Sequence, residues 1–547
     1  MEGSFFIIAR VTTLNTDLIL HNAKIYTVDS SQPWAEAVAC SNGDIIAVGQ
    51  NDEILSLAGP NTRRIDAQQK LVLPGLVDAH VHFLQYTMRQ HQVNLFGVRN
   101  FEEVLRRVQE AVDTAKPNEW IQGYGWDENL WDTQPHRRQL DKIAPHNPVV
   151  LARMDMHTWW VNTTALNVAG ITADTPNPPD SQIERDTSGE LTGLLREWNA
   201  IRLVEQHIPE YDEKILAIWL RETIAQAHQL GLTGIHDQRV ELEGSQSLRL
   251  FQNLNRQEEL NMRVHHNIAA DYLAEAASLG LQAGFGNDRL WLGHLKTFAD
   301  GTMGSRTAWM LNPFEREPDN TGIIITPPEK LAELAWRANQ AGFPMSVHAI
   351  GDRAVREVMA VLGEYPPPAT VFSAGLPHRI EHVQIIHPDD LSQMGQHNIF
   401  ASVQPVHLLT DWPTADKVWG QRARNTYAFR SLRDHGIALA FGSDAPVAPL
   451  NPMLGIYAAV TRQNEQGQPA EGWYPQERLS IAETIEGYTM GPAQVAGKEP
   501  WQGSIAPGKW ADMIVLSRNI FEIPPDELLD VGVDTTIFNG VVVHQTQ

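Results

Sequence analysis

The sequence predicts an α/β fold: a distorted TIM (β/α)8 barrel, a small β-sandwich domain built from both termini, and an inserted subdomain between barrel strands 1 and 2. Three observations predict this arrangement. Eight strand-like apolar runs, most of them separated by helical patterns, fill the middle of the 547-residue chain. Short β-like runs with turn signals such as Asn42-Gly43 occupy both ends. About 150 residues separate the first two central runs, far more than an ordinary loop.

These observations set approximate domain limits. Residues 1–16 are expected to be a flexible lead-in, because their short apolar patch lacks the basic start and small-residue cleavage site of a signal peptide. Residues 17–70 and 499–547 are expected to form the two parts of the sandwich. Residues 71–498 are expected to form the barrel, with the insert at about 95–230.

The eight barrel strands are expected where apolar runs rich in β-branched residues lie between helical patterns. They are Leu71–Val81, Thr233–Asp237, Arg263–Ala269, Trp291–Thr297, Pro344–Ala349, His378–Val383, Ile399–Gln404 and Ile437–Ser443. Helices are expected at Lys214–Leu230, before the second strand, and at Pro328–Gly342. The insert has strand-like pieces of its own, at Trp120–Tyr124 and Pro148–Met154. Long excursions from a barrel usually cover or shape its site.

Composition limits the partners and the kind of site. Lys and Arg total 42 and Asp and Glu total 66, and the net charge of −24 argues against nucleic-acid binding. No apolar run approaches the length of a membrane span. The single cysteine, Cys40, excludes an intrachain disulfide and a cysteine-based metal site. We therefore expect a cytoplasmic protein with a small-molecule substrate and no nucleic acid or membrane partner, and a homodimer is the default assembly.

A pair of histidines ends the first predicted strand. In LVLPGLVDAHVHF, His80 and His82 are two residues apart, so they point to one face at the strand's C-terminal end. Parallel α/β barrels carry their chemistry at that end. Further polar side chains lie at or near the ends of later strands: Lys296, His348, His382 and Asp444. Imidazole and carboxylate ligands suit Zn²⁺, Fe²⁺, Mn²⁺ or Ni²⁺, and there is room for two ions.

Lys296 is an unusual neighbour for a cation, because an ammonium group repels it. Burial lowers the pKa of a lysine, and a neutral lysine can react with CO₂ to give a carboxylate that bridges two ions. Two ions sharing a hydroxide would supply a nucleophile at neutral pH. Asp444 would take the proton from the bridging water and pass it to the leaving group.

The motifs that carry these residues resemble one known family. GLVDAHVH, KTFADGTMGSRTA, SVHAIGDRAV, RIEHVQ, ASVQP and FGSDAP are similar to segments of the amidohydrolase superfamily, in its family-3 branch, whose members include N-substituted formamide deformylase. The resemblance runs from about residue 17 to the end, and GSIAPGKWADMIVL is similar to the segment that closes the sandwich. It implies metal ligation by His80, His82, His348 and His382, a carboxylated Lys296 as bridge, and Asp444 as ligand and proton shuttle.

The insert resembles the same branch. MDMHTWWVNTTAL at Met154–Leu166 is similar to its Asp-x-His-x-x-Trp-x-Asn segment, and GELTGLLRE is similar to its next marker. The resemblance implies that His157 and Trp160 border the substrate cavity, although aromatic residues also fill cores. Arg306, after the fourth strand, and Gln404, at the end of the seventh, are further substrate-binding candidates.

The sequence thus predicts a metal-dependent hydrolase that cleaves a non-peptide C–N bond of the linear amide or N-formyl type. The expected cofactor is a divalent metal, Zn²⁺ first, as one ion or as two bridged by N6-carboxylated Lys296. One alternative keeps the scaffold and changes the reaction to hydrolysis of a cyclic amide, lactone or ester, or to isomerisation. Another is a non-catalytic, metal-binding regulatory protein, although such a protein would not need the proton shuttle.

Overall fold

The computed structural model describes residues 16–154, 158–179, 181–238, 245–368 and 375–546. The chain divides into two compact units. Unit 1 contains the described residues up to Phe83 and those from Arg221 onward, and unit 2 is Leu84–Leu220. Two helices contain the boundaries between the units, α2 at Phe83–Gln90 and α7 at Glu213–Gln229.

An eight-stranded parallel sheet in unit 1 forms a nearly closed barrel. Its strand order is β21-β20-β19-β18-β17-β16-β15-β8, so neighbours in space follow one another in the chain. Each of these strands overlaps one of the eight predicted runs, and the prediction of a TIM barrel is confirmed. Their bounds are β8 Leu76–Val81, β15 Leu232–Asp237, β16 Arg263–Ala269, β17 Leu290–Phe298, β18 Met345–Ala349, β19 Arg379–His382, β20 Phe400–Val403 and β21 Leu439–Phe441.

The first predicted strand is wrong, because the run forms two strands in different sheets. The run Leu71–Val81 is two strands, β7 at Leu71–Pro74 and β8, divided at Gly75. β7 pairs with the sandwich strand β22, whereas β8 pairs with β15 in the barrel. A Cβ on Gly75 would lie 2.2 Å from Oγ1 of Thr233. The missing side chain therefore lets the chain pass from one sheet to the other at this crowded point.

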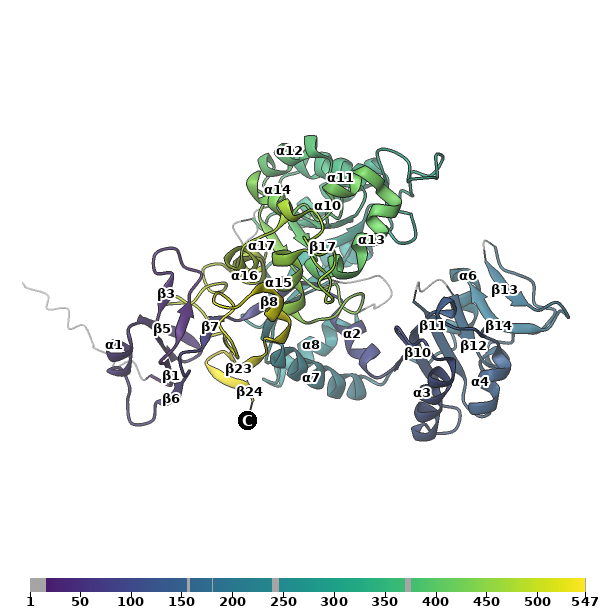
Figure 1. The fold of residues 1–547 in the computed structure, drawn as a ribbon, viewed down its shortest axis with the longest axis horizontal. Helices are drawn as coiled ribbons and strands as arrows, with labels where there is room; N and C mark the ends of the chain where they lie inside the picture. The colour runs from purple at the N-terminus through teal and green to yellow at the C-terminus, as the bar shows by residue number, and fades with distance from the viewer. Residues whose placement is uncertain (1–15, 155–157, 180, 239–244, 369–374, 547) are drawn as a thin grey trace, which may run out of the picture. The chain divides into compact units, whose positions relative to one another are not determined.

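Both ends of the chain build the sandwich, as predicted. Its sheets have the orders β5-β4-β1-β6 and β24-β23-β22-β7-β2-β3, and the purple and yellow ends of the chain meet in the second sheet (Figure 1). Leu18 and Cys40 of the first sheet share a core with Val72 and Met513 of the second. The remaining bounds are β1 Leu18–His21, β2 Lys24–Tyr26, β3 Trp34–Ala35, β4 Ala37–Ser41, β5 Asp44–Gly49, β6 Arg63–Asp66, β22 Met513–Leu516, β23 Val533–Phe538 and β24 Val541–Gln545.

Helices follow most barrel strands. The local sequence explains their ends: Pro328 begins α10 at a position that needs no N–H donor, and Ser480 and Glu483 form a capping box on α16. Besides α7, the helices of unit 1 are α1 Asn51–Leu55, α8 Gln246–Arg256, α9 Leu273–Ser278, α10 Pro328–Gln340, α11 Asp352–Glu364, α12 Leu391–Gln396, α13 Leu408–Trp419, α14 Phe429–Asp434, α15 Pro452–Thr461, α16 Ile481–Tyr488 and α17 Met490–Val495.

Unit 2 is a mixed six-stranded sheet with its own core on each face. Along β11, Val149 and Leu151 pack into one cluster while Val150 and Ala152 pack into the other, as the alternation of side chains requires. The bounds are β9 Val93–Asn94, α3 Phe101–Thr114, β10 Ile121–Trp126, α4 Arg137–Ile143, β11 Val149–Arg153, β12 Thr158–Val161, α5 Thr163–Val168, β13 Gln182–Arg185, β14 Leu191–Arg196 and α6 Trp198–Glu205.

Within the described ranges, no helix combines the length and the apolar character that crossing a membrane would need.

Candidate metal centre

Three predicted ligands from distant parts of unit 1 converge at one end of the barrel. One potential ligand atom from each of His80, His382 and Asp444 lies within 4.8 Å of the others. The Nε2 atoms of His80 and His82 lie 3.3 and 3.2 Å from Oδ1 of Asp444. Ligands bound at about 2.1 Å in a tetrahedral site are about 3.4 Å apart. The donor types and their spacing therefore fit a divalent cation.

Backbone hydrogen bonds fix these side chains across the seam between the first and last barrel strands. The N–H of Asp444 donates to the carbonyl of His80 at 2.7 Å, and the N–H of His82 donates to the carbonyl of Ala445 at 2.8 Å. Asp444 has φ of 59° and His382 has φ of 74°, both in the region that favours glycine. Such uncommon backbone conformations concentrate at functional sites, where the surrounding structure holds them.

Glu381 orients His80, and the sequence did not single it out. Its Oε2 lies 2.6 Å from Nδ1 of His80, and Arg379 and Ser346 bind its other oxygen. Burial raises the pKa of Glu381, but the guanidinium of Arg379 and the hydrogen bond with His80 outweigh burial and hold it well below its usual range. An ionised carboxylate takes the Nδ1–H of the ring, which leaves Nε2 to face Asp444. The sequence does contain one weak signal for Glu381. In RIEH, Arg379 and Glu381 are two residues apart and therefore lie on the same strand face.

Gln404 orients His382 as Glu381 orients His80. Its Oε1 lies 2.8 Å from Nδ1 of His382, and its amide nitrogen donates to the carbonyl of Ser402 at 3.3 Å. An amide oxygen only accepts hydrogen bonds, so His382 donates from Nδ1 and keeps Nε2 for a cation. The Gln404 side chain is buried and occupied by these contacts. Its substrate-binding role stays a prediction.

His348 and Lys296 lie beside this cluster. The ring centroid of His348 is 4.5 Å from that of His382, and its Nε2 bonds the carbonyl of Gly301 at 3.0 Å, which leaves Nδ1 for a ligand. Burial, helped by the charge of Lys296, lowers the pKa of His348 to about 3, so the ring is neutral. Burial also lowers the pKa of Lys296 to about 8, against the carboxylates of Glu381 and Asp444, which raise it.

The other predicted substrate contacts belong to different parts of the chain. Trp160 is fully buried in the core of unit 2, with ring centroids 6.1 and 6.4 Å from those of Trp126 and Trp131. Arg306 is 42% exposed and forms an ion pair with Glu317. His157 lies outside the described residues. Their substrate-binding roles stay predictions.

A further histidine, missed in the sequence, lies near the second carboxylate oxygen of Asp444. Nε2 of His407 lies 3.8 Å from Oδ2 of Asp444, whereas Oδ1 faces His80 and His82. His407 follows Gln404 by three residues in QPVH, and its N–H donates to the Gln404 carbonyl at 3.1 Å. One short turn therefore supplies a side chain to each of two predicted ligands.

Histidines deeper in the barrel are structural. Trp291 donates from Nε1 to Nδ1 of His265 at 2.8 Å. The proton of His265 must then lie on Nε2, which is 3.0 Å from Nδ1 of His294, and His294 in turn donates to the Pro377 carbonyl at 2.9 Å. Burial lowers the pKa of both His265 and His294, which keeps the rings neutral. Their nitrogens are committed to one another and to the backbone rather than to a metal.

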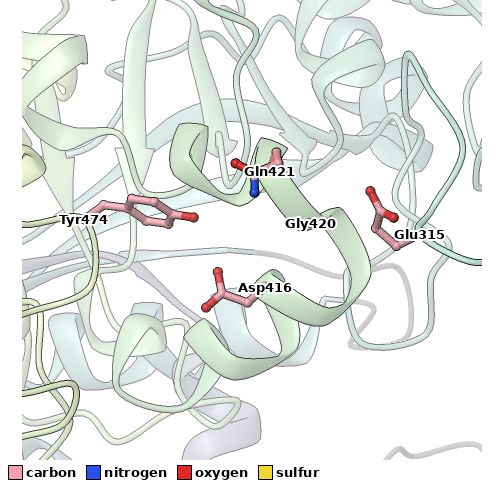
Figure 2. Close-up of a pocket in the computed structure, with 5 residues that line it drawn as sticks. All are labelled: Glu315, Asp416, Gly420, Gln421 and Tyr474. Atoms are coloured by element: carbon pink, nitrogen blue, oxygen red, sulfur yellow. The ribbon is translucent and has the colours of Figure 1, made fainter.

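A hollow of about 490 Å³ on unit 1 has different chemistry. Figure 2 shows Glu315, Asp416, Gln421 and Tyr474 around it, with Gly420 on the adjoining backbone. Asp416 already accepts a hydrogen bond from the indole of Trp473 at 3.1 Å. None of the five lining residues belongs to the predicted site.

Comparison with known proteins assigns the chain to a family. The model of the amidohydrolase family matches residues 63–544. Protein LONG AFTER FAR-RED 3 of Arabidopsis thaliana is 34% identical over 519 residues, which cover 92% of this chain and 88% of that protein. N-substituted formamide deformylase of Arthrobacter pascens is 27% identical over 551 residues, which cover 97% of this chain and 98% of that enzyme.

A solved structure, of an uncharacterized metal-dependent hydrolase from Pyrococcus furiosus, matches with a TM-score of 0.76 and 28% identity over 92% of this chain and 99% of that one. The exoenzymes regulatory protein AepA of Pectobacterium carotovorum subsp. carotovorum is 26% identical over 405 residues, covering 71% of this chain and 84% of that protein. The family match spans most of the chain, including the barrel, strands β6 and β7 of the first part of the sandwich, and nearly all of its second part. This protein belongs to the amidohydrolase family.

Proposed function

We propose that this protein hydrolyses a non-peptide C–N bond in a small linear amide, with an N-formyl amine as the preferred substrate. The observation that carries the proposal is the convergence of His80, His382 and Asp444 at one end of the barrel. The choice of substrate is supported by the similarity to N-substituted formamide deformylase along nearly the whole of both chains.

In this proposal the metal would be held by His80, His82, His348, His382 and Asp444, with Zn²⁺ as the first choice. If two ions bind, carboxylated Lys296 would bridge them. A bound divalent cation lowers the pKa of water and polarises a carbonyl oxygen. Glu381 and Gln404 keep the Nε2 atoms of His80 and His382 directed at the site.

Asp444 would carry the proton. Burial raises its pKa, but the neighbouring histidines His80, His82 and His382 outweigh burial and hold the pKa well below its usual range. The resting group is therefore a carboxylate that can accept a proton from the attacking water. It would then give that proton to the departing nitrogen, which completes cleavage of the C–N bond.

A substrate panel tests the proposal. Metal-loaded protein would be assayed with N-formyl amines, other linear amides, cyclic imides, lactones and aryl esters, together with metal analysis of the same sample. We expect the highest kcat/KM for an N-formyl amine. A higher value for a cyclic imide, lactone or ester would move the reaction to the alternative on the same scaffold.

Full metal content without turnover of any substrate would favour a non-catalytic role, an alternative supported by the similarity to the regulatory protein AepA. Less than one ion per chain under metal-replete conditions would contradict the site itself.

A further inference from the structure

His407 has a buried nitrogen for which the described residues provide no hydrogen bond. Its Nε2 is almost completely buried and has no hydrogen-bond partner among them, although the side chain as a whole is 13% exposed. Buried polar atoms in native proteins are nearly always paired, and exceptions are concentrated where a ligand completes the site. The nearest charged group is Oδ2 of Asp444 at 3.8 Å, which is too far for a hydrogen bond.

The neighbouring carboxylate determines whether Nε2 of His407 is a hydrogen-bond donor or an acceptor. Asp444 is a predicted metal ligand, and a carboxyl group binds a metal as the carboxylate; its Oδ1 faces His80 and His82 and its Oδ2 faces His407. A bare nitrogen lone pair facing that carboxylate would be repelled, whereas an N–H is attracted. The Nε2–H tautomer of His407 is therefore favoured, and the described residues offer this N–H no acceptor at bonding distance.

The backbone holds His407 in this position. It lies in the single turn Pro405–His407 that directly follows β20, and its N–H is bound by the carbonyl of Gln404. The Gln404 side chain in turn contacts His382. The donor is thus tied to the same short segment that orients a predicted ligand, which is the kind of preorganisation that electrostatic catalysis requires.

We propose that His407 is a catalytic residue whose Nε2–H donates a hydrogen bond to the carbonyl oxygen of the substrate as that oxygen gains negative charge. The inference rests on the proposed hydrolysis and adds a protein donor to it. Asp444 lies between the two parts of the site, with Oδ1 facing His80 and His82 and Oδ2 facing His407. Water would thus attack beside Oδ1 of Asp444, and the negative charge on the substrate oxygen would develop beside Oδ2.

Two substitutions separate the hydrogen bond from the shape of the side chain. His407→Met removes the donor and puts an unbranched apolar side chain of similar length in its place. His407→Gln retains an N–H₂ donor at similar reach. Loss of a donor that acts only in the transition state should lower kcat about 100- to 1,000-fold with little change in KM. His407→Gln should recover most of that loss. His435→Met is the matched control, because His435 is exposed after α14, before the last barrel strand begins.

Binding of methylphosphonate, a tetrahedral oxyanion, provides a readout that needs no turnover. Metal-loaded His407→Met should bind it at least about 10-fold more weakly than wild type, while His407→Gln and His435→Met should bind it nearly as tightly and all four proteins should hold the same amount of metal. Equal affinity in all variants, or no binding to wild type, would overturn the role of His407. Absence of amide turnover by wild type together with the expected binding pattern would instead overturn the proposed function and leave the His407 donor in place.

Discussion

At the scale of single side chains, the imidazoles of His80 and His382 are each fixed by a hydrogen bond at Nδ1, the ring nitrogen that does not face the site. Nδ1 of His80 is bound by Glu381 and Nδ1 of His382 by Gln404, at 2.6 and 2.8 Å. Each ring is therefore fixed in one tautomer with Nε2 directed at the site. Outer partners of this kind stabilise a bound metal through ligands that they orient, without touching the ion themselves.

Replacing Glu381 tests this orientation. Glu381→Gln keeps the size of the side chain but removes the charge that takes the Nδ1–H of His80, so we expect metal affinity to fall about 10- to 100-fold. Competition with a chromogenic chelator would measure the affinity. Glu477→Gln is a suitable control, since Glu477 is also buried and hydrogen-bonded, to Ser431. Equal loss of affinity in both variants would mean general destabilisation rather than ligand orientation.

Asp444→Asn separates proton transfer from metal binding. Asparagine keeps a ligand oxygen but cannot accept the proton from water, so kcat should fall about 100- to 10,000-fold while metal content stays close to that of wild type. Turnover of the preferred substrate and metal per chain would be measured on the same preparation. Retained turnover would rule out Asp444 as the proton carrier.

Lys296 has a pKa suited to reaction with CO₂. With a pKa of about 8, about one amine in ten is neutral at pH 7, against about one in 3,000 for an ordinary lysine. The neutral fraction rises with pH. In ¹³C-bicarbonate at pH 8 we expect a carbamate signal in the NMR spectrum of the metal-loaded protein.

The signal should disappear in Lys296→Met and persist in Lys498→Met, since burial also lowers the pKa of Lys498. The same signal in both variants would show that the modified amine is elsewhere.

The residues predicted from the sequence were those marked by local spacing, by a place at the end of a predicted strand or by the motifs of the family resemblance. His80 and His82 share a strand face because they are two residues apart. Glu381 has only the weaker mark of sharing a strand face with Arg379, and His407 has none. Glu381 matters because it reaches a ring 301 residues away in the chain, and His407 because β20 ends close to the turn after β21. Contacts of this kind depend on the closed barrel rather than on sequence spacing.

At the scale of elements, the site depends on the seam where β21 returns to β8. A Cβ on Gly442 would lie 2.4 Å from the backbone nitrogen of His80. Gly442→Ala should therefore push the two strand ends apart and lower the free energy of unfolding by about 1–3 kcal/mol. Metal affinity should fall with it, because His80 and Asp444 lie on opposite sides of the seam.

Denaturant unfolding and chelator competition would measure the two effects. Gly304→Ala is the control, because a Cβ at Gly304 meets nothing within 4 Å among the described residues. If metal affinity stays unchanged while the barrel is destabilised, the seam does not set the ligand geometry.

Strands were predictable where one apolar run makes one strand, as in the barrel strands from β15 to β21. The division between β7 and β8 was not, because LVLPGLVDAHV is apolar through both strands and the change of sheet occurs at a single glycine. What decides the break is the side chain of Thr233, from a strand about 160 residues later in the chain.

At the scale of the whole molecule, all described predicted metal ligands belong to unit 1, while unit 2 has its own sheet and two cores. A ligand that binds only the folded state stabilises it, by about 2.7 kcal/mol at 100 times its Kd. Removing metal with a chelator should therefore speed hydrogen exchange at the ends of β8, β19 and β21. Exchange in β10 and β11 of unit 2 should not change, and equal acceleration in both units would contradict this division.

The long separation between the first two barrel strands predicted an insert, but the sequence predicted less of the insert's internal arrangement. The strand-like pieces at Trp120–Tyr124 and Pro148–Met154 correspond to β10 and β11. The packing of Trp160 against Trp126 and Trp131 follows from the order of strands in the sheet, which the sequence pattern does not specify.

The sandwich sheet that joins β7 to β22 also sets an order of events during synthesis. At roughly 5–20 residues per second, the ribosome needs about 20–90 s to proceed from Pro74 to Met513. Until then the edge of β7 lacks its antiparallel neighbour, and the barrel strand that carries His80 is continuous with that unfinished sheet. The nascent chain therefore has to keep an apolar strand edge from pairing with other chains for most of its time on the ribosome, which makes this segment a natural client for chaperones.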